Sequence, residues 1–295
     1  MRKTILSTAD VARLFNVTET TVKRWADDGT LKCQKTPGGH RKFEMRFIVE
    51  FSKATKFEPA GVLAMPDDDK LGSEIQVAVL RGDFPFLVHA FVDKSLSPGT
   101  TDVGLYLSYL YQHRIPLCDI FDEVVRPGLE AVGERWSCGE IGICHEHRAS
   151  YKTLDALAYL QGQIYTRPSG GKSAVCACID QEGHEIGLRC ASILLESEGW
   201  TCHYIGARTP HDALAGEIRE LRPNIVVLSM TRREPDSPAA EHLREVIAAA
   251  QSVGAKVVLG GSGVPRGTTG GTGVDAVLSS AKELLDFIQG FEHPF

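Results

Sequence analysis

The stretch SAVCACIDQEGHEIG, residues 173–187, decides the fold of the second half of the chain. It opens with a short, nearly continuous apolar run, which is typical of a strand buried on both faces of a parallel sheet. Amphipathic helical segments, the first expected to begin near Glu182, separate it from similar runs at 200–206, 224–230, 255–261 and 274–280. Strands and helices that alternate in this way predict a doubly wound parallel sheet over residues 172–292.

Polar and glycine residues gather at the predicted carboxyl ends of these strands, where such sheets bind their ligands. They are Glu182, His184, Gly187, Ser229, Gly260 and Gly261. A lone histidine after a strand is usually structural, but this one is joined by a serine and by glycines that would admit a flat or extended ligand. The sequence has no GxGxxG or Walker loop, and GTTGGTG at 267–273 is expected to be a plain loop, so NAD or ATP is not indicated.

The charge of the chain is unevenly distributed. Residues 1–53 hold 11 Lys and Arg against 6 Asp and Glu, a net charge of +5, so the remainder of this chain of net charge −6 carries −11. A basic front end on an acidic body is typical of a small module that binds a polyanion and is attached to something else.

The basic segment reads as a helix-turn-helix followed by a wing. Ser7 or Thr8 is expected to cap a first helix, and Thr18 to cap a second helix that runs to about Asp27. Pro37-Gly38-Gly39 predicts a tight turn between two short strands, although a solvated basic hairpin would look similar. We expect double-stranded DNA to be contacted by the second helix and the wing through Thr20, Thr21, Lys23, Arg24, His40, Arg41 and Lys42.

The middle of the chain predicts a linker at 54–70 and a helical bundle at 71–166, in which Pro127 is expected to kink a long helix. Trp136 closes that helix, and Glu146 and His147 begin the next one, so these three side chains are expected to gather at one end of the bundle. A carboxylate beside an imidazole suits hydrogen bonding or acid–base work. A helix start with a favourable glutamate explains the same residues without any ligand.

The eight cysteines form no CxxC pair, and most lie within apolar helix or strand patterns. We therefore expect reduced, buried thiols in a cytoplasmic protein, and no cysteine spacing supports a zinc site. The sequence contains no apolar run long enough to span a membrane, and its first residues lack the apolar core of a signal peptide.

Two parts of the chain resemble known families. Residues 1–53, above all TPGGHRKF, resemble the MerR family of winged-helix regulators. The carboxyl-terminal half resembles the Rossmann-like, flavodoxin-like cobalamin-binding domain, whose pattern is Asp/Glu-x-His-x-x-Gly, then Ser-x-Leu, then Gly-Gly. The resemblance implies that His184 coordinates cobalt from below and that the nucleotide tail of the cofactor passes Ser229, Gly260 and Gly261. Thr231 stands where the family has leucine, and an imidazole is an apt ligand for cobalt.

With a helical cap before the sheet and a DNA module in front, nearly the whole chain resembles the CarH/LitR-type light-sensing transcriptional regulators. Trp136, Glu146 and His147 match the Trp-x9-Glu-His motif of their cap, which shields the upper face of adenosylcobalamin. The resemblance implies a repressor rather than an enzyme. Its DNA-binding homotetramer would fall apart when light breaks the cobalt–carbon bond.

One residue departs from that family. Ser137 follows Trp136 where the well-characterised type has a histidine that captures cobalt after photolysis, and a hydroxyl is a poor replacement for an imidazole. Three alternatives stay open: a regulator that reads only the cobalamin level, a haem-type sensor, and a corrinoid methyl-transfer protein. The basic first domain argues against the last of these.

Overall fold

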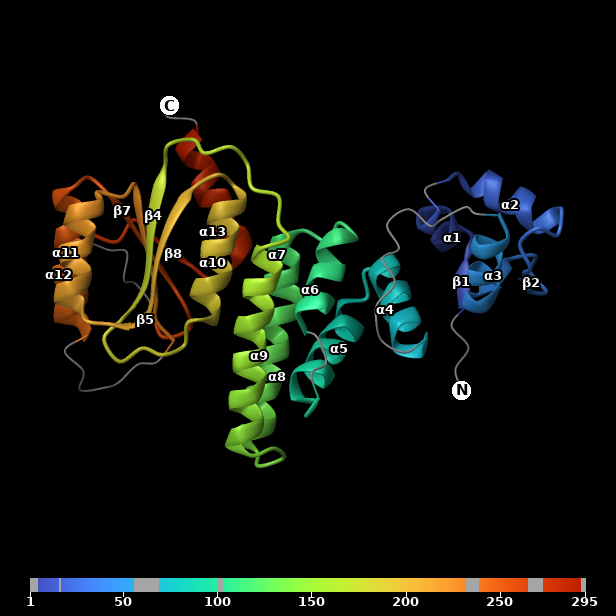
Figure 1. Ribbon diagram of the computed structural model, residues 1–295, viewed down its shortest axis with the longest axis horizontal. Coiled ribbons are helices and arrows are strands. Elements are labelled where there is room, and N and C mark those ends of the chain that lie inside the picture. Colours follow the sequence, from blue (N-terminus) through green and yellow to red (C-terminus); the bar gives the residue numbers. More distant parts are fainter. Residues whose placement is uncertain are drawn as a thin grey trace.

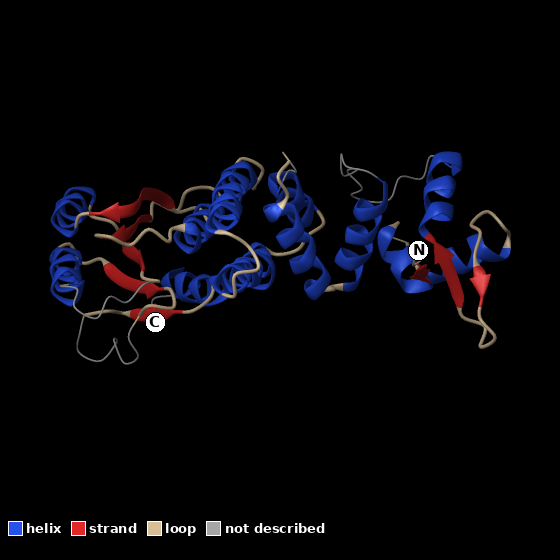
Figure 2. Ribbon diagram, turned by 90° about the horizontal axis from the view of Figure 1, so that it is seen from below, coloured by secondary structure: helices blue, strands red, loops and turns tan. Residues whose placement is uncertain are grey.

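The computed structural model describes residues 5–15, 17–55, 69–99, 103–231, 239–264 and 273–292. Three parts follow one another along the longest axis of the molecule, a winged helix-turn-helix, a group of helices and a helix-covered sheet (Figures 1 and 2). The described helices are all too short or too polar to cross a membrane.

The carboxyl-terminal part is the predicted doubly wound parallel sheet. Its strands are β4 (Ser173–Ile179), β5 (Thr201–Thr209), β6 (Ile225–Ser229), β7 (Lys256–Gly260) and β8 (Ala276–Leu278). All neighbouring strands are parallel, and their order β5-β4-β6-β7-β8 is that of flavodoxin-like folds. Because every strand runs the same way, the residues at the strand ends share one edge of the sheet.

Alternation along β4 divides the apolar core in two. Ala174, Cys176 and Cys178 belong to the same buried cluster as the side chains of the helical part. Val175, Ala177 and Ile179 belong to a second cluster on the opposite face. Helices α10 (Ile186–Ser197) and α13 (Ala281–Gln289) cover the first face, and α11 (His211–Leu221) and α12 (Ala239–Ser252) cover the second (Figure 1).

The expected start of α10 near Glu182 is wrong, because the helix begins at Ile186. The Glu182 side chain accepts hydrogen bonds from the backbone N–H groups of His184 and Thr231, and its carbonyl accepts one from Arg208. These bonds hold residues 182–185 in a loop across the strand ends. Both predicted ligand-binding side chains of this segment are therefore on the loop.

The middle part is helical, as the sequence predicts. Its elements are α4 (Asp69–Arg81), α5 (Phe84–Leu96), α6 (Val103–Gln112), α7 (Leu117–Asp119), η1 (Ile120–Val125), α8 (Arg126–Ser137) and α9 (Ile143–Gln161). The expected single long helix ending at Trp136 is interrupted, since η1 is a π-helix. It lies directly before Pro127, and this wider turn accommodates a residue that has no backbone N–H to donate.

The amino-terminal part is a winged helix-turn-helix with a small antiparallel sheet. It contains β1 (Ile5–Ser7), α1 (Thr8–Leu14), α2 (Glu19–Asp27), β2 (Gln34–Lys35), β3 (Arg41–Glu44) and α3 (Met45–Thr55). Ser7 caps α1 in a reciprocal capping box with Asp10, and Thr18 caps α2, as predicted. Neither β1 nor α3 is predicted by the sequence pattern.

Helix α4 contributes to two different cores. Ile75 and Ala78 are buried with the helical part, whereas Val77 and Leu80 pack into the core of the DNA module. Residues two apart on a helix lie about 200° apart around its axis, so these pairs occupy nearly opposite faces. Arg13 also donates to the carbonyl of Leu80, and Arg81 to that of Ile5, both at 2.7 Å. The remainder of the predicted linker, 56–68, lies outside the described residues.

Candidate functional site

The first candidate site is built on the loop that follows β4. The Glu182 carboxylate lies 2.6 Å from His184 Nδ1, and its other oxygen accepts the backbone N–H of Thr231 at 2.7 Å. A carboxylate partner keeps the proton on Nδ1, so the lone pair of a neutral ring is on Nε2. The Glu182 side chain is only 8% exposed, whereas that of His184 is 50% exposed. A buried carboxylate thus orients an accessible imidazole, which is the arrangement of a metal ligand.

The thiol closest to this loop does not compete for a metal. Burial, together with the negative charges of Glu182 and Glu185, raises the pKa of Cys178 to about 12, although a hydrogen bond with Ser229 opposes the shift. The thiol is therefore protonated at neutral pH, and it donates to the backbone carbonyl of His184 at 3.8 Å. Because the thiolate is the ligand form of cysteine, His184 is the better donor here.

The glycines near the strand ends differ in whether backbone packing alone requires them. A Cβ at Gly261 would lie 2.3 Å from the Met230 carbonyl oxygen and its φ is +101°, so the backbone alone requires glycine there. By contrast, a Cβ at Gly187 would meet nothing within 4 Å, and one at Gly260 would only touch the Leu278 carbonyl at 3.5 Å. Packing does not demand glycine at these two positions, whereas the close approach of a ligand would. Ser229 is buried beside Gly260 in the register of β6 and β7. These residues fit a corrinoid.

The cap residues lie around the loop between α8 and α9. Glu146 accepts from His147 Nδ1 at 2.6 Å and from the Ser150 hydroxyl at 2.9 Å. Trp136, at the end of α8, is 44% exposed although it is a large apolar side chain. Glu146 and His147 are thus hydrogen-bonded to each other, and the indole of Trp136 is accessible to a binding partner. An exposed tryptophan and an exposed imidazole, on the two helices that this loop joins, suit contact with a large flat ligand.

Ser137 lies next to Trp136 but points its hydroxyl elsewhere, since it donates to the carbonyl of Glu134 in its own helix at 2.8 Å. The loops after β4 and after α8 both lie on the lower side of the molecule in Figure 1. The predicted lower ligand and the predicted cap residues are therefore at the same end of their respective parts.

The second candidate site is the surface of α2. Thr20, Lys23 and Arg24 are exposed, while Thr21 is half-buried with its hydroxyl 3.0 Å from that of Thr18. Lys23 lies 3.6 Å from Glu19 in an exposed pair, which costs little to break. These short polar and basic groups follow the start of the helix, where a recognition helix contacts base edges and phosphates.

The wing contributes its cations unequally. His40 and Lys42 are exposed, but the Arg41 side chain is only 19% exposed and its Nη2 lies 2.7 and 2.8 Å from the two carboxylate oxygens of Asp27. Lys35 Nζ lies 3.4 Å from the same carboxylate. Arg41 therefore holds the wing against the end of α2, a role that the sequence analysis did not assign to it.

This difference predicts two distinct effects on DNA binding. Arg41→Gln is expected to weaken binding about two- to fivefold, because only the half-exposed ion pair with Asp27 that holds the wing is lost. Lys42→Gln is expected to lower the slope of log affinity against log salt by about one unit, because a phosphate contact is lost. Fluorescence anisotropy at several salt concentrations measures both quantities. A fall in the slope with Arg41→Gln would show that Arg41 contacts phosphate directly.

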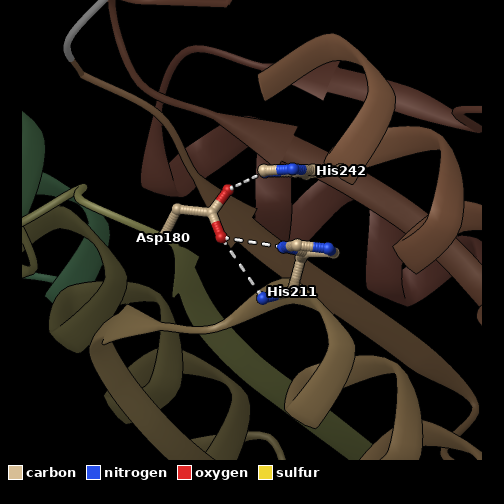
Figure 3. A group of neighbouring side chains, drawn as sticks. All are labelled: Asp180, His211 and His242. Atoms are coloured by element: carbon tan, nitrogen blue, oxygen red, sulfur yellow. Dashed lines mark hydrogen bonds and ion pairs between the residues drawn. The ribbon is translucent and has the colours of Figure 1, made fainter. Parts of the chain in front are cut away.

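The structure also assembles a cluster that the sequence analysis missed. Asp180, His211 and His242 come together on the face of the sheet covered by α11 and α12 (Figure 3). The sequence signals for this cluster were a carboxylate directly after a predicted strand and one histidine near the start of each of two later helices. None of these signals is specific for a metal site by itself.

Three family models match the chain. A helix-turn-helix domain matches residues 5–51, and two families described as B12 binding domains match residues 74–161 and 172–286. Together they cover the three parts of the structure.

Individual relatives agree with these matches. The chain is 29% identical over 232 residues to the HTH-type transcriptional repressor CarH of Myxococcus xanthus, a match that covers 74% of this chain and 76% of that protein. It is 32% identical over 146 residues to the repressor CarA of the same organism, covering 50% and 47% of the two proteins. The monomethylamine corrinoid protein of Methanosarcina barkeri has the same fold over 72% of this chain and 99% of its own, with a TM-score of 0.57 and 16% identity.

Proposed function

We propose that the chain is a CarH-like cobalamin-binding transcriptional regulator, a light-responsive repressor that uses adenosylcobalamin and is not an enzyme. The observation that carries this proposal is the pairing of His184 with the buried carboxylate of Glu182, in a chain that also has a DNA module and a cap. A methyl-transfer protein would have the first feature but no use for α2 and the wing.

In this proposal His184 would hold the cobalt of the cofactor through Nε2. Glu182 fixes the ring by its hydrogen bond to Nδ1, and carboxylate partners of this kind raise the basicity of an imidazole ligand. Gly187 and Gly260 leave room for the ring and the nucleotide tail, and buried Ser229 lines the tail channel.

The cap residues would cover the upper face. Adenosylcobalamin, when bound, supplies a cobalt–carbon bond that visible light can break. Trp136 and the Glu146–His147 pair would exclude water from that face, because the indole and imidazole rings are exposed and so available to contact the cofactor. Ser137 offers no imidazole to cobalt after photolysis, and its hydroxyl is already engaged by Glu134. We therefore expect no stable bis-imidazole product, and faster recovery in darkness.

Ligand contacts would reach the DNA module through α4, because this helix is packed into both cores. Only one arrangement of the cap would assemble the homotetramer that binds double-stranded operator DNA, so the ligand shifts the population of that arrangement. For this shift to occur, the ligand must bind the two arrangements of the cap with different affinities.

The test is a comparison before and after green light. The full chain is purified in darkness with adenosylcobalamin, and absorption, size-exclusion and operator binding are recorded on the same sample. We expect the spectrum to change, the oligomer to become smaller and DNA to be released. A sample loaded with cyanocobalamin is the matched control and should keep its size and its DNA. An unchanged oligomer and unchanged DNA binding in the illuminated sample would rule out the light switch.

Ser137 favours one further candidate, a regulator that reads the cobalamin level in darkness. In that case adding adenosylcobalamin would change DNA binding by the same amount with and without illumination. A haem-type sensor would instead purify with a haem spectrum.

A further inference from the structure

Asp180, His211 and His242 form a cluster on the side of the sheet away from α10, α13 and the cap (Figures 1 and 3). Asp180 directly follows β4, His211 is the first residue of α11, and His242 lies in the first turn of α12. Three separate elements therefore supply one group each. The side chains are 23–25% exposed, so they are partly shielded but open to a small ion.

Both imidazoles lie within hydrogen-bonding distance of the same carboxylate, that of Asp180. His211 Nδ1 lies 3.1 Å from one oxygen of Asp180, and His242 Nδ1 lies 2.7 Å from the other. The two rings are stacked, with centroids 3.6 Å apart and planes 8° apart. The backbone N–H of His211 also donates to Asp180, at 3.3 Å. Two nitrogen donors and one oxygen donor thus converge, and among the described residues no lysine or arginine hydrogen-bonds to them.

The side-chain contacts of Asp180 join its carboxylate to the two imidazoles and to the backbone N–H of His211. A carboxylate beside two imidazoles is a set of groups that suits a cation.

Glu245 supplies the outer partner that a metal-bound histidine needs. Its carboxylate lies 3.5 Å from His211 Nε2, on the far side of the ring from Asp180. When Nδ1 binds a metal, the proton of the neutral ring moves to Nε2, where a carboxylate can accept it. The neutral His211 ring keeps its single proton when that proton moves from Nδ1 to Nε2, and the ring keeps its orientation.

We propose that Asp180, His211 and His242 bind a divalent metal ion of the zinc class. Two imidazoles and one carboxylate are a donor set that zinc and similar borderline ions use, with water free to complete the coordination. The candidate donor atoms all lie within 4.8 Å of one another. Donors around a tetrahedral zinc ion are about 3.4 Å apart, so closure needs only small side-chain movements. The ion would tie the end of β4 to α11 and α12.

The test uses the full chain without a histidine tag, stripped with a chelator, and Zn²⁺ alone as the probe. Equilibrium dialysis with metal analysis is expected to give about one Zn²⁺ per chain, with a rise in the melting temperature. Asp180→Asn and His242→Ala are expected to weaken binding at least about tenfold each. Asparagine tolerates the positive φ of 55° at this position, and equal melting temperatures of the metal-free proteins check that the variants fold.

Two controls separate this cluster from other zinc ligands. Cys138 and Cys144 are exposed near His145, so a Cys138→Ser/Cys144→Ser double variant removes the competing thiols. His89→Ala removes a surface histidine that also pairs with a carboxylate, that of Asp93 at 3.3 Å. Both controls should bind Zn²⁺ as the parent does. Absence of binding by the parent, its loss in the thiol control, or unchanged binding by Asp180→Asn and His242→Ala would each overturn the proposal.

Discussion

His184→Ala is expected to weaken cobalamin binding at least about a hundredfold, because it removes the accessible imidazole nitrogen that we propose as the ligand of cobalt. Even an outer partner of a metal ligand is worth about 10- to 100-fold in affinity, and a direct ligand should be worth no less. The bound cofactor, where any remains, should also change its absorption spectrum, since an axial nitrogen is lost. Equilibrium dialysis with absorption spectroscopy measures both effects.

Two comparisons make this result specific. Glu182→Gln keeps the size of the side chain and removes its charge, so it should weaken binding about tenfold and leave His184 in place. His89→Ala, on the exposed surface of α5, should leave affinity and spectrum unchanged. Wild-type affinity in His184→Ala would mean that cobalt takes its lower ligand elsewhere.

The second large effect concerns DNA. Replacing both Lys23 and Arg24 with alanine is expected to weaken operator binding about a hundredfold near physiological salt. Each side chain is exposed on α2, and each lost phosphate or base contact is worth about 1–3 kcal/mol or one unit of salt slope. Fluorescence anisotropy across a salt series gives the affinity and the slope together.

The matched control is Lys282→Ala, an exposed lysine on α13 in the cobalamin-binding part. It changes the net charge in the same direction but should leave operator affinity within a factor of about two. If the double variant behaved like this control, the basic face of α2 would not be the DNA surface.

The sheet was predictable because local signals and tertiary context agree there. Buried parallel strands read as apolar runs whatever their partners, so β4, β6 and β7 appear within a residue or two of their predicted ends. The start of α10 was misplaced because the long-range bonds from Thr231 and Arg208 to Glu182, which help to hold residues 182–185 in a loop, cannot be read from the local sequence. Pro127 predicted the interruption of the long helix, but not its form, a π-helix over Ile120–Val125.

The two sites differ in how much of them the sequence contains. Glu182 and His184 are two residues apart, so their contact follows from one loop. Asp180 meets His211 and His242 across 31 and 62 residues, and only the parallel strand order brings their elements together. Arg41 was assigned to DNA because its neighbours are cationic, and its pairing with Asp27, 14 residues away, required the structure.

Helix α4 has a consequence for protein engineering. Because Val77 and Leu80 complete the core of the DNA module, a fragment ending at Thr55 would leave apolar surface of that module bare. A chimera that grafts the DNA module onto another sensor should therefore carry residues up to Arg81, together with the contacts from Arg13 to Leu80 and from Arg81 to Ile5. The exchangeable unit of this chain then ends after α4, one helix later than the basic segment itself.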